Sequence, residues 1–324
     1  MISLTEWGEG RIVDHTSGNR SMDKQAITEF MQKYGEELMR NSRERQDVDE
    51  NAVFQPANLK NRPIIEKILQ ALLLPGSKML HFERLKELYE RARAGESCLI
   101  LSEHYSNFDI PNLFYLAHAF GEEGDRVVNS IIPMAGKKLN AESRFVLAFT
   151  EAYTRIVIYP SRDLQKLEGK SEFEEERRLS RAINRSALRE MIRAKHAGHP
   201  ILVFPAGTRY RPGVPESKRG LPEIDSYIKS FDHMLLIGIA GNVLQVDPTG
   251  NMEADIPQQD LVIYNMGEIL NCRSFREDAR REGGFDKHAS GNEAKQKVVG
   301  RVMEKLEELH REAEAERQRL LAEL

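Results

Sequence analysis

The chain has 324 residues, 40% of them hydrophobic and 30% charged, which is the composition of a globular protein with a hydrophobic core. Its formal net charge of -4 argues against a general nucleic-acid binder, and its two cysteines are too few for a disulfide framework. The longest apolar run, at 234–244, is too short to span a bilayer. We therefore expect a cytoplasmic protein whose contact with the inner membrane, if it makes one, is peripheral.

Helical patterns dominate the first 95 residues from Asp23 onward. Apolar residues recur at helical spacing from Asp23 onward, and Pro63 stands at the start of a second apolar helix that Pro75 ends. A third helix is expected to run to Gly95, a residue typical of helix ends. Because short connections join these helices, they predict an N-terminal helical bundle domain over residues 1–95.

Short apolar runs alternate with helical segments after Gly95. This alternation predicts an α/β domain over residues 96–324, with a mixed, largely parallel central sheet flanked by helices. Long helices are expected near 174–197 and 293–324. Six runs are expected to form strands: 97–101, 127–135, 155–159, 200–204, 235–240 and 261–265.

The stretch CLILSEHYSNFD, residues 98–109, carries one predicted strand into a polar turn. In open α/β sheets, catalytic groups stand just beyond the carboxyl ends of the strands. A neutral imidazole at His104 is suited to act as a general base, and the Asp109 carboxylate five residues later can orient it. In the alternative, structural interpretation, His104 only ends the strand and Asp109 caps the following helix.

Basic residues follow three other predicted strands. Arg209 and Arg211 lie in PAGTRYRPG (205–213), where glycine lets backbone N–H groups approach an anion and guanidinium groups match phosphate oxygens. Lys137, Lys138 and Arg162 form the other two clusters. These cations are expected to converge near His104 and to bind a phosphorylated substrate. Alternatively, 205–213 is only an exposed turn set by its prolines and glycines.

Two motifs resemble those of the glycerolipid acyltransferases. HYSNFD, residues 104–109, fits their H-x-x-x-x-D motif, and FPAGTR, residues 204–209, resembles their F-P-E-G-T-R block. The similarity is greater to the soluble, plastid-type glycerol-3-phosphate acyltransferases, over roughly residues 95–245. IVIYPSRD (156–163), INRSALREM (183–191) and AGTRYRP (206–212) resemble further blocks of that group.

The resemblance implies a glycerol-3-phosphate acyltransferase, with an acyl group moving directly from acyl-CoA or acyl carrier protein to the acceptor. His104 would be the base and Asp109 its orienting partner. Gly207 and Thr208 would lie in the loop that stabilises the oxyanion, and no cofactor or metal is implied. The residues expected to bind the phosphate of glycerol 3-phosphate are Arg162, Arg209 and Arg211, together with Lys137 and Lys138.

The chain departs from the family pattern at three positions near these motifs. Glu103 replaces the asparagine usual before the histidine, and Ala206 stands where the wider family has glutamate. Asp163 replaces a histidine beside the basic cluster, which removes one expected phosphate contact and adds a negative charge there.

Several alternative functions share parts of this pattern. A lysophosphatidate acyltransferase would carry both motifs, and a lipid-binding module without activity could keep the fold. The arginine face of the helix at 174–197 is either solvated or a docking face for an acidic acyl carrier protein. A nucleic-acid partner is not expected, because no aromatic platform accompanies these arginines. His196 and His199 lack a third ligand for a metal.

Overall fold

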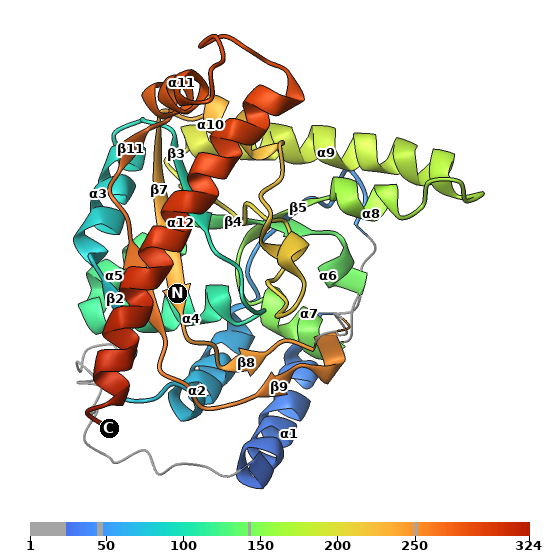
Figure 1. The fold of residues 1–324 in the computed structure, drawn as a ribbon. Coiled ribbons are helices and arrows are strands. Elements are labelled where there is room, and N and C mark those ends of the chain that lie inside the picture. Colours follow the sequence, from blue (N-terminus) through green and yellow to red (C-terminus); the bar gives the residue numbers. More distant parts are fainter. Residues whose placement is uncertain (1–23, 44–47, 142–143, 248, 250–251) are drawn as a thin grey trace, which may run out of the picture.

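Five buried aliphatic runs form the parallel centre of a nine-stranded sheet in the computed structural model, which describes residues 24–43, 48–141, 144–247, 249 and 252–324 (Figure 1). The order across the sheet is β1-β5-β4-β6-β3-β7-β10-β2, and β11 pairs with β7. The parallel strands are β3 (Cys98–Ser102), β4 (Ile132–Gly136), β5 (Arg155–Ile158), β6 (Ile201–Val203) and β7 (His233–Ala240). The sheet is therefore mixed and largely parallel, as expected.

The outer strands of the sheet are short. β1 (Phe54–Gln55) runs antiparallel to β5, and β10 (Ile263–Met266) and β11 (Leu270–Asn271) run antiparallel to β7. β2 (Lys78–Leu80) lies parallel to β10 at the far edge. A separate hairpin of β8 (Leu244–Gln245) and β9 (Ile256–Pro257) follows β7.

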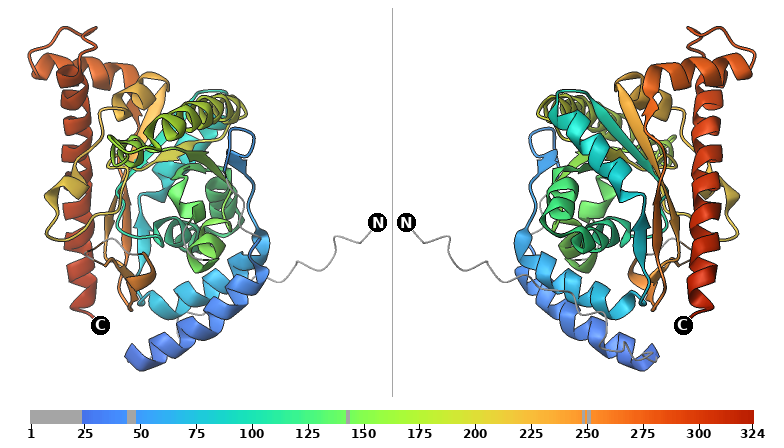
Figure 2. Two further views of the ribbon diagram at one scale, coloured as in Figure 1. Left: turned by 90° about the vertical axis from the view of Figure 1, so that its right-hand side faces the viewer. Right: turned by 90° about the vertical axis from the view of Figure 1, so that its left-hand side faces the viewer.

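Alternating side chains of the central strands supply two hydrophobic cores, one on each face. Ile100 and Leu235 pack with one set of helices, whereas Leu99 and Leu236 pack with the other. The first set comprises α1 (Lys24–Asn41), α2 (Arg62–Leu72), α3 (Phe82–Arg93), α4 (Asp109–Ala117), α5 (Gly121–Ser130) and α7 (Arg144–Thr150). The second comprises α9 (Phe173–His196), α10 (Ile224–Lys229), α11 (Cys272–Glu282) and α12 (Asn292–Leu321) (Figure 2). Two shorter helices are α6 (Lys138–Ala141) and α8 (Ser161–Gln165).

The described residues before position 96 are joined closely to the sheet. Their helices share one hydrophobic core with the central strands, since Ile65 and Leu69 belong to the same cluster as Ile100. They also contribute the edge strands β1 and β2. A separate N-terminal helical bundle is therefore not shown by the described residues, and the boundary at 95/96 stays a prediction.

The strand expected at 127–135 begins later than predicted. Val127 and Val128 are buried in the last turns of α5, and the chain becomes extended only at Ile131. A continuous apolar run does not distinguish the end of a buried helix from a buried strand, which is why the two elements merged in the sequence pattern.

The C-terminal helix α12 packs along β7 and β10, with Val298, Val302 and Leu306 fully buried. Gly238 permits this close contact, because a Cβ atom there would stand 2.6 Å from the backbone nitrogen of His310. None of the helices in the described part of the chain has the length and hydropathy of a membrane span. α12 thus brings His310 to the edge of the sheet where the candidate site lies.

Candidate active site

The two sequence motifs meet at the carboxyl edge of the sheet. His104 follows β3 and the loop at 205–213 follows β6, and these strands are direct neighbours. The Tyr210 N–H donates to the carbonyl of His104 over 2.8 Å. The rings of His104 and Phe204 stack with their centroids 3.9 Å apart. The fold therefore holds the imidazole against the loop that carries the arginines.

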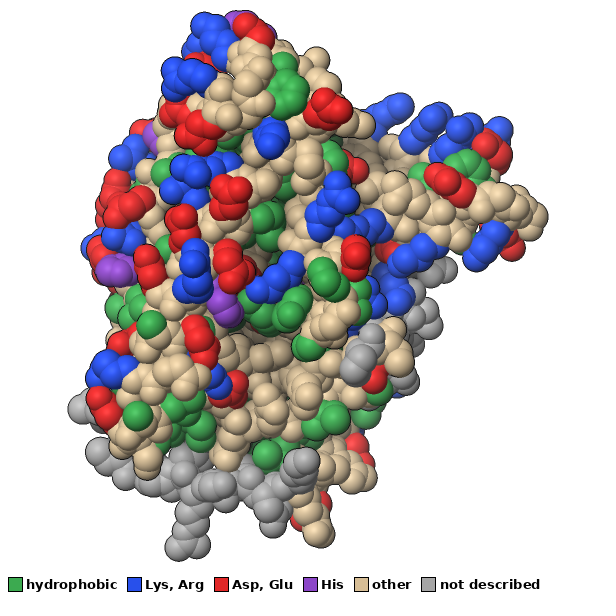
Figure 3. Space-filling view, viewed as in Figure 1, with side chains coloured by type: hydrophobic (Ala, Val, Ile, Leu, Met, Phe, Trp, Pro, Cys, Tyr) green, Lys and Arg blue, Asp and Glu red, His purple; other side chains and the backbone are tan. Residues whose placement is uncertain are grey.

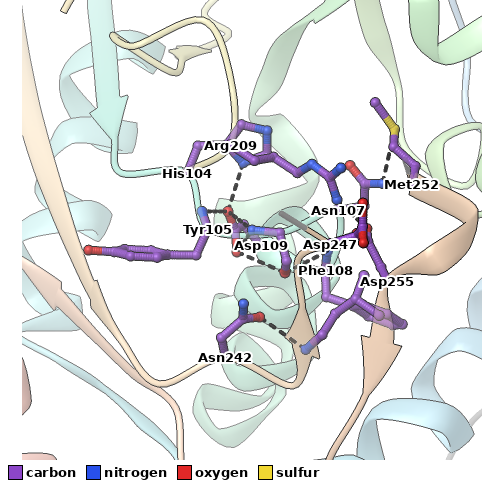
Figure 4. A network of polar contacts seen from close by, with 12 residues as sticks. His104, Tyr105, Asn107, Phe108, Asp109, Arg209, Asn242, Asp247, Met252 and Asp255 are labelled. Carbon is purple, nitrogen blue, oxygen red and sulfur yellow. Dashed lines mark hydrogen bonds and ion pairs between the residues drawn. The ribbon is translucent and has the colours of Figure 1, made fainter. Parts of the chain in front are cut away.

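Asp109, the first residue of α4, contacts the Nδ1 edge of the imidazole (Figure 4). His104 Nδ1 lies 2.8 Å from Asp109 Oδ2, and the same carboxylate accepts the N–H groups of Tyr105 at 2.6 Å and Ser106 at 3.0 Å. A carboxylate that accepts the neighbouring backbone N–H groups favours the imidazole tautomer whose hydrogen is on Nδ1. Nε2 of His104 is then left to accept a proton.

The orienting carboxylate is itself fixed deep in the protein. Asp109 is only 4% exposed, and the hydroxyl of Tyr264 donates to its backbone carbonyl over 2.7 Å. Burial raises the pKa of the Tyr264 phenol, so this group remains a donor. The pair of His104 and Asp109 is thus a rigid, internally bonded unit at the edge of the sheet.

A cavity of about 970 Å³ opens beside His104 and is large enough for a lipid-like molecule. Lys138, Gly207, Thr208, Arg209 and Arg211 line its polar part. Apolar side chains line much of the remainder, among them Ile110, Met134, Phe149, Tyr153, Leu188 and Met191. One cavity therefore combines a base, several cations and an apolar wall.

Arg209 and Arg211 differ in their partners. Arg209 forms an ion pair with Asp255, and both side chains are almost completely buried, at 7% and 2% exposure. Arg211 is not paired with any described carboxylate, and its Nε is buried without a hydrogen-bond partner in the described structure. Arg211 is consequently the better placed of the two to bind an anion in the cavity.

Arg162 lies close to Arg211 and to Arg219. Burial lowers the pKa of Arg162, and the neighbouring charges of Arg211 and Arg219 act in the same direction, while Glu223 opposes them. Its Nη2 donates to the carbonyl of Arg219 over 3.4 Å. These three arginines outnumber the nearby carboxylates Glu223 and Asp163, so the region is positive and suits a phosphate.

The two lysines of the sequence prediction occupy different surroundings. Lys138 lines the cavity, whereas the ammonium of Lys137 lies 5.5 Å from the centre of the Tyr159 ring. Neither Lys137 nor Arg162 is among the residues that line the cavity. The structure thus brings Lys138, Arg209 and Arg211 to the cavity of His104, and places Arg162 beside Arg211.

The loop at Gly207 lines the cavity and contains one backbone N–H without an acceptor among the described residues. Gly207 has a φ of +62°, and a Cβ atom there would lie 2.6 Å from the Leu221 side chain, so only glycine fits. Its N–H already donates to the carbonyl of Phe204 over 2.9 Å. For the Thr208 N–H, in contrast, the described residues provide no acceptor. Thr208 is thus the more available of the two predicted oxyanion donors.

Three further charged residues of this region were not predicted from the sequence. Asp255 and Arg219 lie in polar loops with no periodic pattern, so no sequence signal identified them. Arg155, at the start of β5, lines the cavity, and its burial lowers its pKa to about 10. Its position as the first residue of the run RIVIY was the only available signal.

No group of three or more potential metal ligands occurs among the described His, Cys, Asp and Glu residues. The Nδ1–H of His199 donates to the Ser130 carbonyl over 2.8 Å, and His196 is exposed. The site therefore consists of an oriented imidazole, a cationic region and an apolar wall.

The sequence matches no model of a protein family, and no curated protein matches it in a sequence search.

Proposed function

We propose that the protein is a glycerol-3-phosphate acyltransferase, which transfers a fatty acyl group from a thioester to a glycerol hydroxyl. One observation carries the proposal: the imidazole of His104, oriented by Asp109, opens into the same cavity as Arg211. The resemblance of HYSNFD and FPAGTR to acyltransferase motifs supports the same reaction. The product would be lysophosphatidate, and we place the reaction in the cytoplasm with peripheral contact to the inner membrane.

His104 would act as the general base. Its Nε2 takes the hydroxyl proton while the glycerol oxygen bonds to the carbonyl carbon of the thioester. The Thr208 N–H is available to donate to the oxyanion that forms. When the tetrahedral intermediate collapses, the carbon–sulfur bond breaks and the departing sulfur takes the proton from His104. No covalent acyl-enzyme is needed.

The cationic region would bind the phosphate of the acceptor. Arg211 has a guanidinium group without a described carboxylate partner, and Arg162 lies beside it. Arg209 is already neutralised by Asp255, so its role would be to hold the loop rather than to bind phosphate alone. Asp163 lines the same cavity and limits how many anionic groups the site can accept.

The acyl chain would occupy the apolar part of the cavity, and α9 provides a face for the donor. Leu188 lines the cavity yet is 51% exposed on α9. The exposed arginines Arg178, Arg181 and Arg185 follow the same side of that helix, in a region where basic side chains gather on the surface (Figure 3). This stripe, which we call the α9 arginine stripe, suits an acidic acyl carrier protein.

The direct test compares two acceptors, glycerol 3-phosphate and lysophosphatidate, each with acyl-CoA and with acyl carrier protein as donor. We expect acyl transfer with glycerol 3-phosphate and a kcat/KM at least about tenfold lower with lysophosphatidate. This factor corresponds to a difference of about 1.4 kcal/mol in activation free energy between the two acceptors. The reverse order would identify a lysophosphatidate acyltransferase. Binding of lipids without transfer to either acceptor would support a lipid-binding module instead.

A further inference from the structure

Glu103, directly before His104, is a buried carboxylate in an unusual position. Its Oε2 accepts the Ile239 N–H over 2.8 Å, and its Oε1 accepts the Tyr105 hydroxyl over 3.0 Å. It is 9% exposed. Two neutral donors satisfy its oxygens but do not balance its charge, and a buried charge without a counter-ion is unfavourable.

The counter-ion comes from the C-terminal helix. His310 Nδ1 lies 3.3 Å from Glu103 Oε2, 3.1 Å from the Tyr105 hydroxyl and 2.6 Å from the Ile239 carbonyl. The hydrogen bond to Glu103 raises the pKa of His310, and the charge of Glu103 adds to this effect, while burial and Lys218 oppose it. α12 therefore reaches the sheet edge with an imidazole whose charged form is stabilised by the Glu103 carboxylate.

Tyr105 connects this group to the candidate catalytic pair. Its side chain is held by Glu103 and His310, and its backbone N–H donates to Asp109 Oδ2 over 2.6 Å. We propose that His310 is a positioning residue: as an imidazolium it neutralises Glu103, holds Tyr105 and thereby keeps Asp109 oriented toward His104. This inference rests on the proposed function and adds a residue about two hundred positions away in the sequence.

The imidazole of His310 is not needed to attach α12 to the sheet. Elsewhere the helix is held by its buried residues Val298, Val302 and Leu306 and by the Arg317–Asp260 and Lys78–Glu316 ion pairs. Among the described residues, Lys218 of the 3-10 helix Pro215–Lys218 is a further charged group that acts on His310, and it pairs with Glu307 at 3.2 Å. A His310 variant is therefore expected to fold.

The pH dependence of the effect follows from the direction of the pKa shift. The pKa of His310 is raised in the folded protein, so the stabilising charge is fully present below the unfolded value of about 6.5. It is lost as the pH rises through the raised folded value. Positioning should therefore be best on the acidic side of that titration and should weaken above it.

The test measures kcat and KM from pH 6 to 9 for the wild type, His310→Gln and His310→Lys. At pH 6, kcat of His310→Gln should be roughly tenfold below that of the wild type, with little change in the KM for the acceptor. A displacement of a catalytic group by about 1 Å can lower the rate by more than that factor. The pH profile of this variant should also lack the fall in kcat at alkaline pH that deprotonation of His310 causes in the wild type. His310→Lys keeps a cation across this pH range and should recover part of kcat above that decline.

Two controls separate positioning from general damage. The exposed His288 provides a matched substitution, and His288→Gln should leave kcat and its pH profile unchanged. Glu103→Gln should lower kcat, and adding His310→Gln to it should cause little further loss because both act through one contact. Wild-type kcat and an unaltered pH profile in His310→Gln would overturn the inference.

A readout without turnover distinguishes this inference from the proposed function. In protein with ¹⁵N-labelled histidine, the Nδ1–H signal that His104 shares with Asp109 should be sharp at pH 6 and broaden as His310 loses its proton. If the signal is coupled to His310 in this way but no acyl transfer occurs, only the proposed function fails. If acyl transfer occurs and the signal is the same in His310→Gln, the positioning role fails.

Discussion

Asp109 determines how His104 is presented, because three N–H donors converge on its carboxylate within one turn of chain. At the residue scale, the orientation of His104 thus depends on hydrogen bonds that are formed within the segment HYSNFD, residues 104–109. The cations around it are not equivalent. Arg209 is bound to a buried partner, whereas Arg211 has no carboxylate partner among the described residues.

This difference predicts that loss of Arg211 affects substrate binding, whereas loss of Arg209 affects the stability of the protein. Arg211→Ala should raise the KM for glycerol 3-phosphate by roughly tenfold to a hundredfold, because a hydrogen bond to a charged group contributes about 1.5–3 kcal/mol, and its melting temperature should change little. Steady-state kinetics and thermal unfolding measure both quantities. An unchanged KM would place the phosphate elsewhere.

Arg209→Ala should instead destabilise the protein. The substitution leaves the Asp255 carboxylate buried without its counter-ion, and loss of one partner of a buried pair typically costs about 3–5 kcal/mol. Adding Asp255→Asn should restore much of the lost stability in denaturant unfolding. Equal stability of Arg209→Ala and the wild type would contradict this account of the pair.

At the scale of elements, the site is assembled from the ends of neighbouring parallel strands, with α9 and α12 as additions from one face. The α9 arginine stripe contrasts with other arginines of the same helix, since Arg177 pairs with Glu174 and Arg193 pairs with Glu190. Arg178, Arg181 and Arg185 form no such ion pair with a described residue. Unpaired surface charge of one sign is what an oppositely charged partner requires.

Charge reversal tests the stripe. Arg181→Glu with Arg185→Glu should raise the KM for acyl carrier protein by about tenfold, equivalent to about 1.4 kcal/mol, and leave the KM for acyl-CoA nearly unchanged. The matched control reverses Arg273 and Arg281, two exposed arginines of α11. Equal kinetics with carrier protein for both double variants would show that the stripe is only a solvated face.

Strong local patterns predicted the elements that position the site. The apolar run before His104 corresponds to β3, because a strand that is buried on both sides has a continuous apolar sequence. The amphipathic pattern at 174–197 corresponds to α9, because a helix that buries one side has apolar residues at helical spacing. The contacts of Glu103 with His310 and of Arg209 with Asp255 left no such period. They join residues far apart in the chain, and only the fold brings them together.

For the whole molecule, the helices described before residue 96 are part of the same core as the sheet. The two edge strands of this part of the chain were not predicted, since β1 has two residues and β2 has three, which is too short for an alternating pattern. Fully buried residues of α2, such as Ile68 and Leu69, pack in the cluster that contains the central strands. Unfolding of the N-terminal helices should therefore disturb the entire protein.

A core substitution tests this integration. Ile68→Ala should lower the free energy of unfolding by about 2–5 kcal/mol, since it leaves a cavity in a fully buried site. Calorimetry should show one transition that shifts as a whole. Two transitions, of which only one shifts, would indicate an independent N-terminal domain as the sequence pattern suggested.

The most direct test of the central claim is acyl transfer to glycerol 3-phosphate by the wild type and by His104→Ala, with the exposed His288→Ala as the control. Because general base catalysis typically contributes about 10²–10⁴-fold, kcat/KM should fall by that factor in His104→Ala and remain at the wild-type value in the control. Full activity in His104→Ala would contradict the account.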